Sequence, residues 1–240
     1  MTRYHPGFSD MARLQQFLKY HEIDLILDVG ANRGQYAQSI RWGGYEGNIV
    51  SFEPLKDAYS SLKKASCRDR KWAVAERMAI GERDSTTAIN VAKNSLSSSI
   101  LNICPNHLAA APESRYIGSE RVPLRRLDTV APGYFPGHKR LFLKMDVQGY
   151  ERQVLDGATG ILGWLTGIQM ELSFVTLYEG QPLFPDMIQV MRTLGFELHG
   201  IMPEFADCQT GRLLQADGVF CKTGGAPTEL YGSSAAVPSI

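Results

Sequence analysis

Residues 28–34, with the sequence DVGANRG, have the residue types and spacing of a ligand-binding loop. The segment follows a short apolar run, residues 24–29, and precedes a helical pattern, so it connects a predicted strand to a predicted helix. Gly30 and Gly34 permit a tight turn and let a ligand come close to the backbone. The first amides of a helix carry a partial positive charge. The loop therefore fits a polar ligand, although an ordinary strand-to-helix turn explains the same residues.

Glu53 ends the next predicted strand, residues 48–53, about 20 residues beyond the loop. A carboxylate in this place can accept two hydrogen bonds from a ribose diol. Pro54 follows it and fits the first position of the next helix. Taken alone, Glu53 is equally explained as an acid that the helix dipole favours. The loop and the acid together indicate a nucleoside-containing ligand at the carboxyl edge of a sheet.

Two residues of the loop distinguish S-adenosylmethionine from a nicotinamide dinucleotide. The second glycine of the dinucleotide fingerprint leaves room for the pyrophosphate, and Asn32 occupies that position here. Asp28, at the head of the loop, would repel a pyrophosphate but could pair with the ammonium group of a methionine moiety. Both departures favour S-adenosylmethionine.

Asp146, Glu171 and His107 are the candidate catalytic residues. Asp146 follows an apolar run, residues 140–145, and could orient an acceptor or take its proton, or simply cap the next helix. Glu171 lies within an apolar strand, where a carboxylate needs a partner, so a sugar contact and a structural ion pair are both open. The two acids could also hold a divalent cation, but no third ligand is evident, and we predict no metal site. His107 is a candidate general base, although a single histidine is more often structural.

The elements that must position these residues alternate between strand and helix. Such a rhythm predicts an α/β sandwich with a mostly parallel sheet. Strands are expected at residues 24–29, 48–53, 72–80, 86–92, 140–145 and 167–173, with a final antiparallel pair at 196–201 and 213–221. Helices are expected at residues 35–42, 55–66, 152–165 and 184–194.

Residues 94–121 break this alternation and are rich in Ser, Pro and Ala. Long irregular stretches inside a compact domain are usually functional lids or disordered loops, and we expect a lid. The chain as a whole reads as a single domain over residues 1–224, with an N-terminal helix within residues 1–22. The Gly-, Ala-, Ser- and Pro-rich residues 225–240 are expected to form a flexible tail.

The composition of the 240-residue chain excludes several classes of protein. Its 25 Lys and Arg balance its 25 Asp and Glu, which argues against a dedicated nucleic-acid binder. Its four cysteines form no CxxC pair and suit free thiols in a reducing cytosol. The first residues lack the apolar region of a signal peptide, and apolar runs reach only about six residues, too few for a membrane span. We therefore expect a soluble cytoplasmic protein.

Three ordered motifs resemble the FkbM family of S-adenosylmethionine-dependent methyltransferases. They are the loop at residues 28–34, the tripeptide FEP at 52–54 and the segment KMDVQGYE at 144–151. The family typically shows D-V-G-A-N-x-G, F-E-P and K-x-D-V-E-G-x-E in this order. Gln148 replaces the usual glutamate of the third motif, which puts the role of that carboxylate in question. The resemblance extends over residues 23–222, nearly the whole chain.

The resemblance implies a class I methyltransferase, a Rossmann-like sandwich whose seven-stranded, mostly parallel sheet has a last antiparallel strand. It implies that Asp28, Gly30, Asn32 and Gly34 surround the methionine end of the cofactor and that Glu53 holds its ribose. Ala79 and Ile80, together with Met78, would lie near the adenine ring.

The hypothesis for function is an S-adenosylmethionine-dependent O-methyltransferase acting on a sugar hydroxyl. The acceptor would be a small molecule or glycan, such as a glycolipid, a polysaccharide or a glycosylated natural product, because known family members mostly methylate such hydroxyls. Nucleic acid is not an expected partner. An NAD(P)-dependent oxidoreductase and a non-catalytic nucleoside-binding module remain alternatives. The non-catalytic module would keep Gly30 and Glu53 but could dispense with the acids at Asp146 and Glu171.

Overall fold

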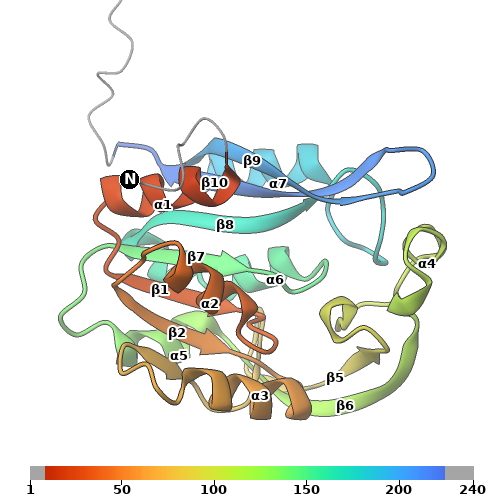
Figure 1. Ribbon diagram of the computed structural model, residues 1–240, viewed down its shortest axis with the longest axis horizontal. Coiled ribbons are helices and arrows are strands. Elements are labelled where there is room, and N and C mark those ends of the chain that lie inside the picture. Colours follow the sequence, from red (N-terminus) through yellow and green to blue (C-terminus); the bar gives the residue numbers. More distant parts are fainter. Residues whose placement is uncertain (1–8, 225–240) are drawn as a thin grey trace, which may run out of the picture.

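The computed structural model describes residues 9–224 (Figure 1). The expected flexible tail, residues 225–240, and the first eight residues lie outside this part of the chain. The N-terminal helix is present as α1 (Asp10–Tyr20), and the side chain of Ser9 caps its first turn by accepting a hydrogen bond from the amide of Ala12.

A seven-stranded sheet forms the centre of the molecule, in the order β3-β2-β1-β7-β8-β10-β9. The strands are β1 (Leu25–Val29), β2 (Asn48–Phe52), β3 (Trp72–Val74), β7 (Leu141–Met145), β8 (Leu165–Ser173), β9 (Phe196–Ala206) and β10 (Leu213–Lys222). The last strand of the chain, β10, lies between β8 and β9 and is antiparallel to both, while the other pairings are parallel. The predicted fold class and the final antiparallel pair are therefore confirmed.

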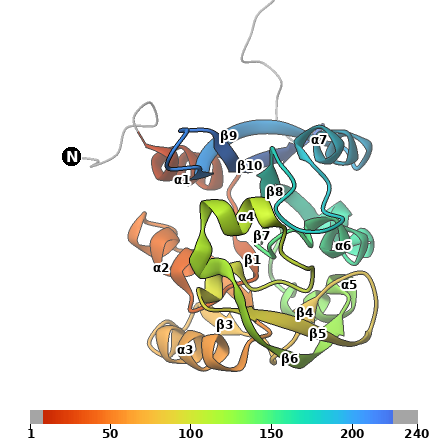
Figure 2. The same ribbon diagram turned by 90° about the vertical axis from the view of Figure 1, so that its right-hand side faces the viewer.

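Helices cover both faces of this sheet and make a three-layer sandwich (Figure 2). One face carries α1, α2 (Gln35–Trp42) and α3 (Lys56–Ser66), which share one apolar cluster with the strands. The other face carries α5 (Leu127–Val130), α6 (Glu151–Asp156) and α7 (Phe184–Thr193), together with the 3-10 turns η3 (Ala131–Tyr134) and η4 (Thr159–Trp164). Because both faces are covered, β1 and β7 are buried along their whole length, as their continuous apolar runs predict.

A second sheet, β4-β6-β5, was not predicted. Its strands are β4 (Ala79–Ile80), β5 (Ser85–Ala92) and β6 (Tyr116–Arg125). The single strand expected at residues 72–80 is wrong, because β3 pairs with β2 in the large sheet whereas β4 pairs with β6 in the small one. An apolar run shows that residues 72–80 are buried but does not reveal that the chain changes sheets within it.

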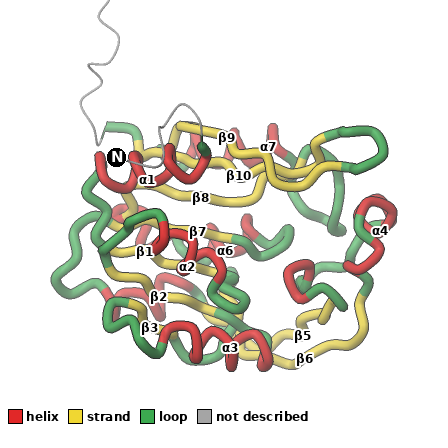
Figure 3. Tube along the Cα trace, in the orientation of Figure 1, coloured by secondary structure: helices red, strands yellow, loops and turns green. Residues whose placement is uncertain are grey.

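Residues 94–121 are only partly irregular. They contain η1 (Ser95–Ser97), α4 (Pro105–Ala110) and η2 (Pro112–Ser114), and from Tyr116 they form the first part of β6. The prediction missed β6 because its first half is largely exposed and polar, so it lacks the apolar signal of a core strand. The short helices lie opposite the carboxyl ends of the central strands, on the same side as β5 and β6 (Figure 3).

The helical stretch expected at residues 152–165 is present in two pieces, α6 and the 3-10 turn η4. α6 stops at Asp156, and Gly157 follows it. A Cβ at Gly157 would lie 1.9 Å from the carbonyl oxygen of Gly81, so this close backbone approach requires glycine.

Among residues 9–224, none of the helices combines the length and apolar character needed to cross a bilayer.

Candidate active site

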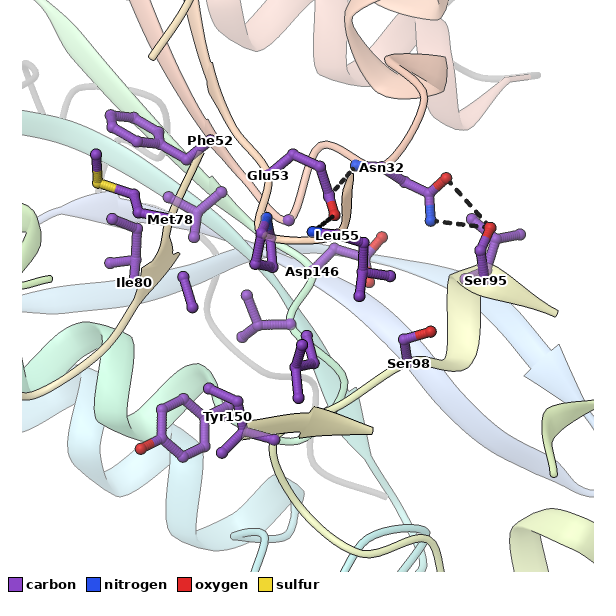
Figure 4. Close-up of a pocket in the computed structure, with 18 residues that line it drawn as sticks. Asn32, Phe52, Glu53, Leu55, Met78, Ile80, Ser95, Ser98, Asp146 and Tyr150 are labelled. Carbon is purple, nitrogen blue, oxygen red and sulfur yellow. Dashed lines mark hydrogen bonds between the residues drawn. The ribbon is translucent and has the colours of Figure 1, made fainter. Parts of the chain in front are cut away.

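A pocket of about 610 Å³, measured with its open mouth, lies at the carboxyl ends of β1, β2 and β7 (Figure 4). This edge is where parallel α/β sheets place their ligands. Six of the predicted site residues line it: Gly30, Asn32, Glu53, Ala79, Ile80 and Asp146. The other four, Asp28, Gly34, Glu171 and His107, do not line it.

The backbone of the β1–α2 loop needs glycine at two points. Gly30 has a φ of +80°, and a Cβ on it would lie 1.9 Å from the carbonyl oxygen of Asp146 in the neighbouring loop. Gly34 has a φ of +91°, and a Cβ there would meet the ring of Trp72 at 2.7 Å. Gly30 therefore shapes the pocket wall directly, whereas Gly34 supports the loop from behind.

The carboxylate of Glu53 links the β1–α2 loop to the start of α3 through two hydrogen bonds. Its Oε2 accepts a hydrogen bond from the amide of Asn32 at 2.7 Å, and its Oε1 accepts one from the amide of Leu55 at 2.8 Å. The residue is only 3% exposed. Burial raises the pKa of Glu53 to about 7, although both backbone hydrogen bonds oppose the shift. Each oxygen retains a lone pair, so the carboxylate can still accept hydrogen bonds from a diol.

Cofactor binding is expected to weaken as the pH falls through about 7, because protonated Glu53 loses acceptor capacity towards a ribose diol. The dissociation constant for S-adenosylhomocysteine should rise several-fold, at most about tenfold, between pH 8 and pH 6. Without ligand, the contribution of Glu53 to the free energy of unfolding should fall as the pH rises from 4.5 to about 7. Over this range the carboxyl is protonated in the folded protein but ionised in the unfolded chain. Calorimetric titrations across this range measure the first effect. A dissociation constant that does not change with pH would contradict the prediction. Glu53→Gln is the control, and its dissociation constant should not change with pH.

Apolar side chains form the wall beside Glu53. Figure 4 shows Met78 and Ile80 on one side of this carboxylate and Asn32 and Ser95 on the other. Met78, Ala79 and Ile80, the residues predicted to lie near the adenine ring, thus line the pocket, and an apolar wall suits a nucleobase ring.

Asp28 lies outside the pocket and is fully buried. Its Oδ2 accepts a hydrogen bond from Ser51 Oγ at 2.9 Å, and its Oδ1 lies 3.8 Å from Lys144 Nζ. Burial raises the pKa of Asp28, while the Lys144 charge opposes the shift. The structure gives Asp28 a role beneath the loop, and its contact with a methionine moiety stays a prediction.

Asp146 and Glu171 are brought together by Gln148. The side-chain Nε2 of Gln148 donates to Asp146 Oδ1 at 2.8 Å and to Glu171 Oε2 at 2.7 Å. Lys144 Nζ donates to Asp146 Oδ2 at 3.2 Å. Asp146 does not cap α6, whose N-cap is Tyr150, so the alternative of a helix cap does not apply. Of the two acids, Asp146 alone lines the pocket.

The two carboxyls have opposite electrostatic environments. Burial raises the pKa of Asp146, but the Lys144 charge and the hydrogen bonds from Gln148, Lys144 and Glu171 outweigh it and bring the pKa below its ordinary value. For Glu171, burial and the nearby charges of Asp146, Glu151 and Asp217 raise the pKa well above the ordinary value. The pair therefore combines a carboxylate that stays ionised with one that readily holds a proton.

His107 lies away from this pair. It is buried in α4, where its ring centroid is 5.1 Å from that of Tyr178 and 5.5 Å from that of Phe205. Burial lowers the pKa of His107 to about 4. Because it does not line the pocket, its role as general base stays a prediction, and the carboxylates are the groups that the fold brings together.

Several pocket residues escaped the sequence analysis. Ser95, Leu96 and Ser98, from the segment after β5, line the pocket, and the Asn32 side chain lies within 3.3 Å of Ser95 Oγ. The serine-rich composition of this segment was the available signal.

Within residues 9–224, no group of three or more His, Cys, Asp or Glu side chains is arranged to hold a metal ion.

Three solved structures illustrate what the chain is similar to. A proposed RNA methyltransferase, PH1948, from Pyrococcus horikoshii is 12% identical, with a TM-score of 0.45 over 89% of this chain and 81% of that one. TehB from Haemophilus influenzae is 8% identical, with a TM-score of 0.46 over 92% and 63%. A proposed S-adenosylmethionine-dependent methyltransferase from Listeria monocytogenes is 8% identical, with a TM-score of 0.49 over 88% and 97%. These scores are too low to identify the chain.

The family comparison is decisive. No curated protein matches the chain. The model of the methyltransferase FkbM domain matches residues 28–198, well over half of its length, and this range includes the loop, Glu53 and the pair Asp146 and Glu171. The chain therefore belongs to the FkbM methyltransferase domain family and is an S-adenosylmethionine-dependent methyltransferase.

Proposed function

We propose that the protein is an O-methyltransferase that methylates a sugar hydroxyl of a glycolipid, a polysaccharide or a glycosylated natural product. One observation carries the proposal. The same pocket is lined by Glu53, the proposed ligand of the ribose, and by Asp146, a carboxylate joined through Gln148 to Glu171. A cofactor site and a group able to accept a hydroxyl proton thus meet in one cavity.

The pocket residues fit S-adenosylmethionine part by part. Glu53 can bind the ribose diol, and Met78 and Ile80 can pack against the adenine. Gly30 and Asn32, at the opposite side of Glu53, would hold the methionine end.

Asp146 is the residue that we assign to the acceptor. When bound, S-adenosylmethionine would supply an electrophilic methyl group to the acceptor oxygen and leave as S-adenosylhomocysteine. Asp146 can orient the hydroxyl and take its proton, because Lys144 keeps the carboxylate ionised. The pocket walls align the groups and exclude water, and orientation of this kind can supply about 7–11 kcal/mol.

The sugar acceptor rests on the family resemblance and on the chemistry of the acid pair. Carboxylate oxygens are strong acceptors for the hydroxyl groups of a sugar. A nicotinamide-dependent oxidoreductase fits less well, because Asn32 occupies the position where the pyrophosphate needs glycine. A cytoplasmic location accords with four free cysteines, Cys67, Cys104, Cys208 and Cys221.

Isothermal titration calorimetry with S-adenosylhomocysteine, with NAD as the paired control, tests the cofactor assignment. We expect micromolar binding of the first and none of the second. Acceptors that bear deoxysugars would then be screened with a labelled methyl donor, and transfer to a hydroxyl is the expected result. Absence of S-adenosylhomocysteine binding, or transfer only to amines, would overturn the proposal.

Residues 94–121 are proposed as the lid of this site, since Ser95, Leu96 and Ser98 line the pocket. Amide hydrogen exchange in this segment is expected to slow about tenfold or more when S-adenosylhomocysteine binds, because ordering against the ligand suppresses local opening. Mass spectrometry of peptides from residues 94–121 measures the change, with α3 as an internal reference that should stay constant. Unchanged exchange in the segment would rule out a lid.

A further inference from the structure

Gln148 occupies the space between two carboxylates. Its single NH2 group donates one hydrogen bond to Asp146 and one to Glu171, at 2.8 and 2.7 Å. The residue is 9% exposed, so water does not replace these bonds readily. Both N–H donors of the amide are therefore used on the two acids of the proposed site.

The orientation of this amide is fixed from its other end. Tyr178 Oη lies 2.6 Å from Gln148 Oε1 and 3.2 Å from the carbonyl oxygen of Ser97, and donation over the shorter distance places the amide nitrogen towards the acids. The reversed amide would direct its carbonyl oxygen at Asp146, which stays ionised and offers no donor. Tyr178 is itself fully buried, so the donor that selects the orientation has little freedom to move.

The backbone of Gln148 is held in place as well. It has a φ of +55°, in the left-handed region that non-glycine residues seldom adopt. Ser99 Oγ donates to its carbonyl oxygen at 2.7 Å, and this serine belongs to the segment that follows β5. A strained backbone that is held by a distant segment indicates that the position of this side chain is built into the fold.

Asp146 and Glu171 accept hydrogen bonds from the same amide nitrogen, so the two carboxyl groups lie close together and need a donor between them. Lys144 contacts Asp146 on its far side, and Glu151 and Asp217 add further negative charge near Glu171. Adjacent acids in proteins are usually reconciled by a shared proton or by a divalent cation with oxygen ligands. In this chain the raised pKa of Glu171 lets it hold a proton towards Asp146, and the two N–H groups of Gln148 take the place of a cation between the acids.

We infer that Gln148 is a positioning residue whose amide bridges Asp146 and Glu171 in place of a divalent cation. The inference rests on the proposed function for the meaning of the acid pair. It deepens that proposal, because it makes the acid pair independent of a bridging metal ion. It also gives a physical role to the position where the family motif usually has glutamate.

Substitution by glutamate tests the bridge directly. Gln148→Glu removes the donors and places three carboxylates together, so the variant should acquire affinity for a divalent cation. In about 1 mM MnCl2 its Tm should rise by about 3–5 °C relative to EDTA, with one Mn²⁺ bound per chain by electron paramagnetic resonance. The wild type should bind no Mn²⁺ and shift by less than about 1 °C.

Gln169→Glu is the matched control. Gln169 is also a buried amide, and its Nε2 donates to Asp217 Oδ2 at 2.6 Å, but no hydrogen bond links it to a second carboxylate. This variant should gain no Mn²⁺ site. The double variant Gln148→Glu with Glu171→Gln should lose the site, since it again has two carboxylates and one amide, as the wild type has.

Gln148→Met supplies a second test that does not depend on the folding of the glutamate variant. Without these donors the ionised form of Glu171 is less stable, and this form gains weight as the pH rises. The Tm of the variant should therefore fall further below wild type at pH 8 than at pH 6. A residue that served only to fill space would lower the Tm equally at both pH values.

Two results would overturn the inference. The first is stoichiometric Mn²⁺ binding by the wild type that Asp146→Asn abolishes. The second is a Gln148→Met variant whose Tm difference from wild type is independent of pH. None of these measurements uses a cofactor or an acceptor, so they stand apart from the calorimetric test of the proposed function.

Discussion

Replacing Asp146 by asparagine is expected to lower turnover by about 10²–10⁴-fold, the range for loss of a general base. The amide keeps the size of the side chain but cannot take a proton. Asp146 lines the pocket with a side chain that is 35% exposed, whereas its neighbour Lys144 is buried. Cofactor binding should change by no more than about threefold, because Glu53 and the apolar wall make the contacts assigned to the nucleoside.

The measurement is the single-turnover rate of labelled methyl transfer, together with a calorimetric titration of S-adenosylhomocysteine. Asp217→Asn is the matched control, since Asp217 is a nearby acid that hydrogen-bonds Gln169 and does not line the pocket. Its turnover should stay close to the wild-type value. A wild-type rate for Asp146→Asn would mean that Asp146 neither orients the acceptor nor takes its proton.

Replacing Glu53 by alanine is expected to weaken cofactor binding by at least about tenfold, which corresponds to about 1.4 kcal/mol. The change removes the proposed ribose acceptor. It also leaves the buried amides of Asn32 and Leu55 without the oxygens that they now bond, at a cost of about 1–3 kcal/mol for each donor that finds no other partner. The loop that carries Asn32 should therefore lose order as well as its ligand contact.

Calorimetry with S-adenosylhomocysteine gives the change in affinity, and a thermal melt separates it from loss of fold. Glu120→Ala is a suitable control, because Glu120 also accepts a hydrogen bond from a backbone amide, that of Lys56, but lies outside the pocket. Its dissociation constant should match the wild type. If Glu53→Ala remained folded with an unchanged dissociation constant, the ribose assignment would have to be abandoned.

The sequence by itself determined the framework of the sheet and the cofactor edge of the site. β1 and β7 are continuous apolar runs, and only strands that are covered on both faces can bury such runs completely. Gly30, Glu53 and Asp146 each follow a strand directly, so parallel pairing is enough to bring them to one edge. These features depend on local pattern and on chain order, both of which can be read from the residues.

Tertiary structure decided what each of these side chains contacts. The bond between Gln148 and Glu171 joins residues 23 positions apart, and the contact between Asn32 and Ser95 joins residues 63 positions apart. Partners far away in the chain likewise decide that β4 pairs with β6 and not with the large sheet. They also decide that His107 packs against Tyr178 and does not line the pocket. Local periodicity carries no information about such pairings, because they are selected by packing and hydrogen bonding once the sheet has formed.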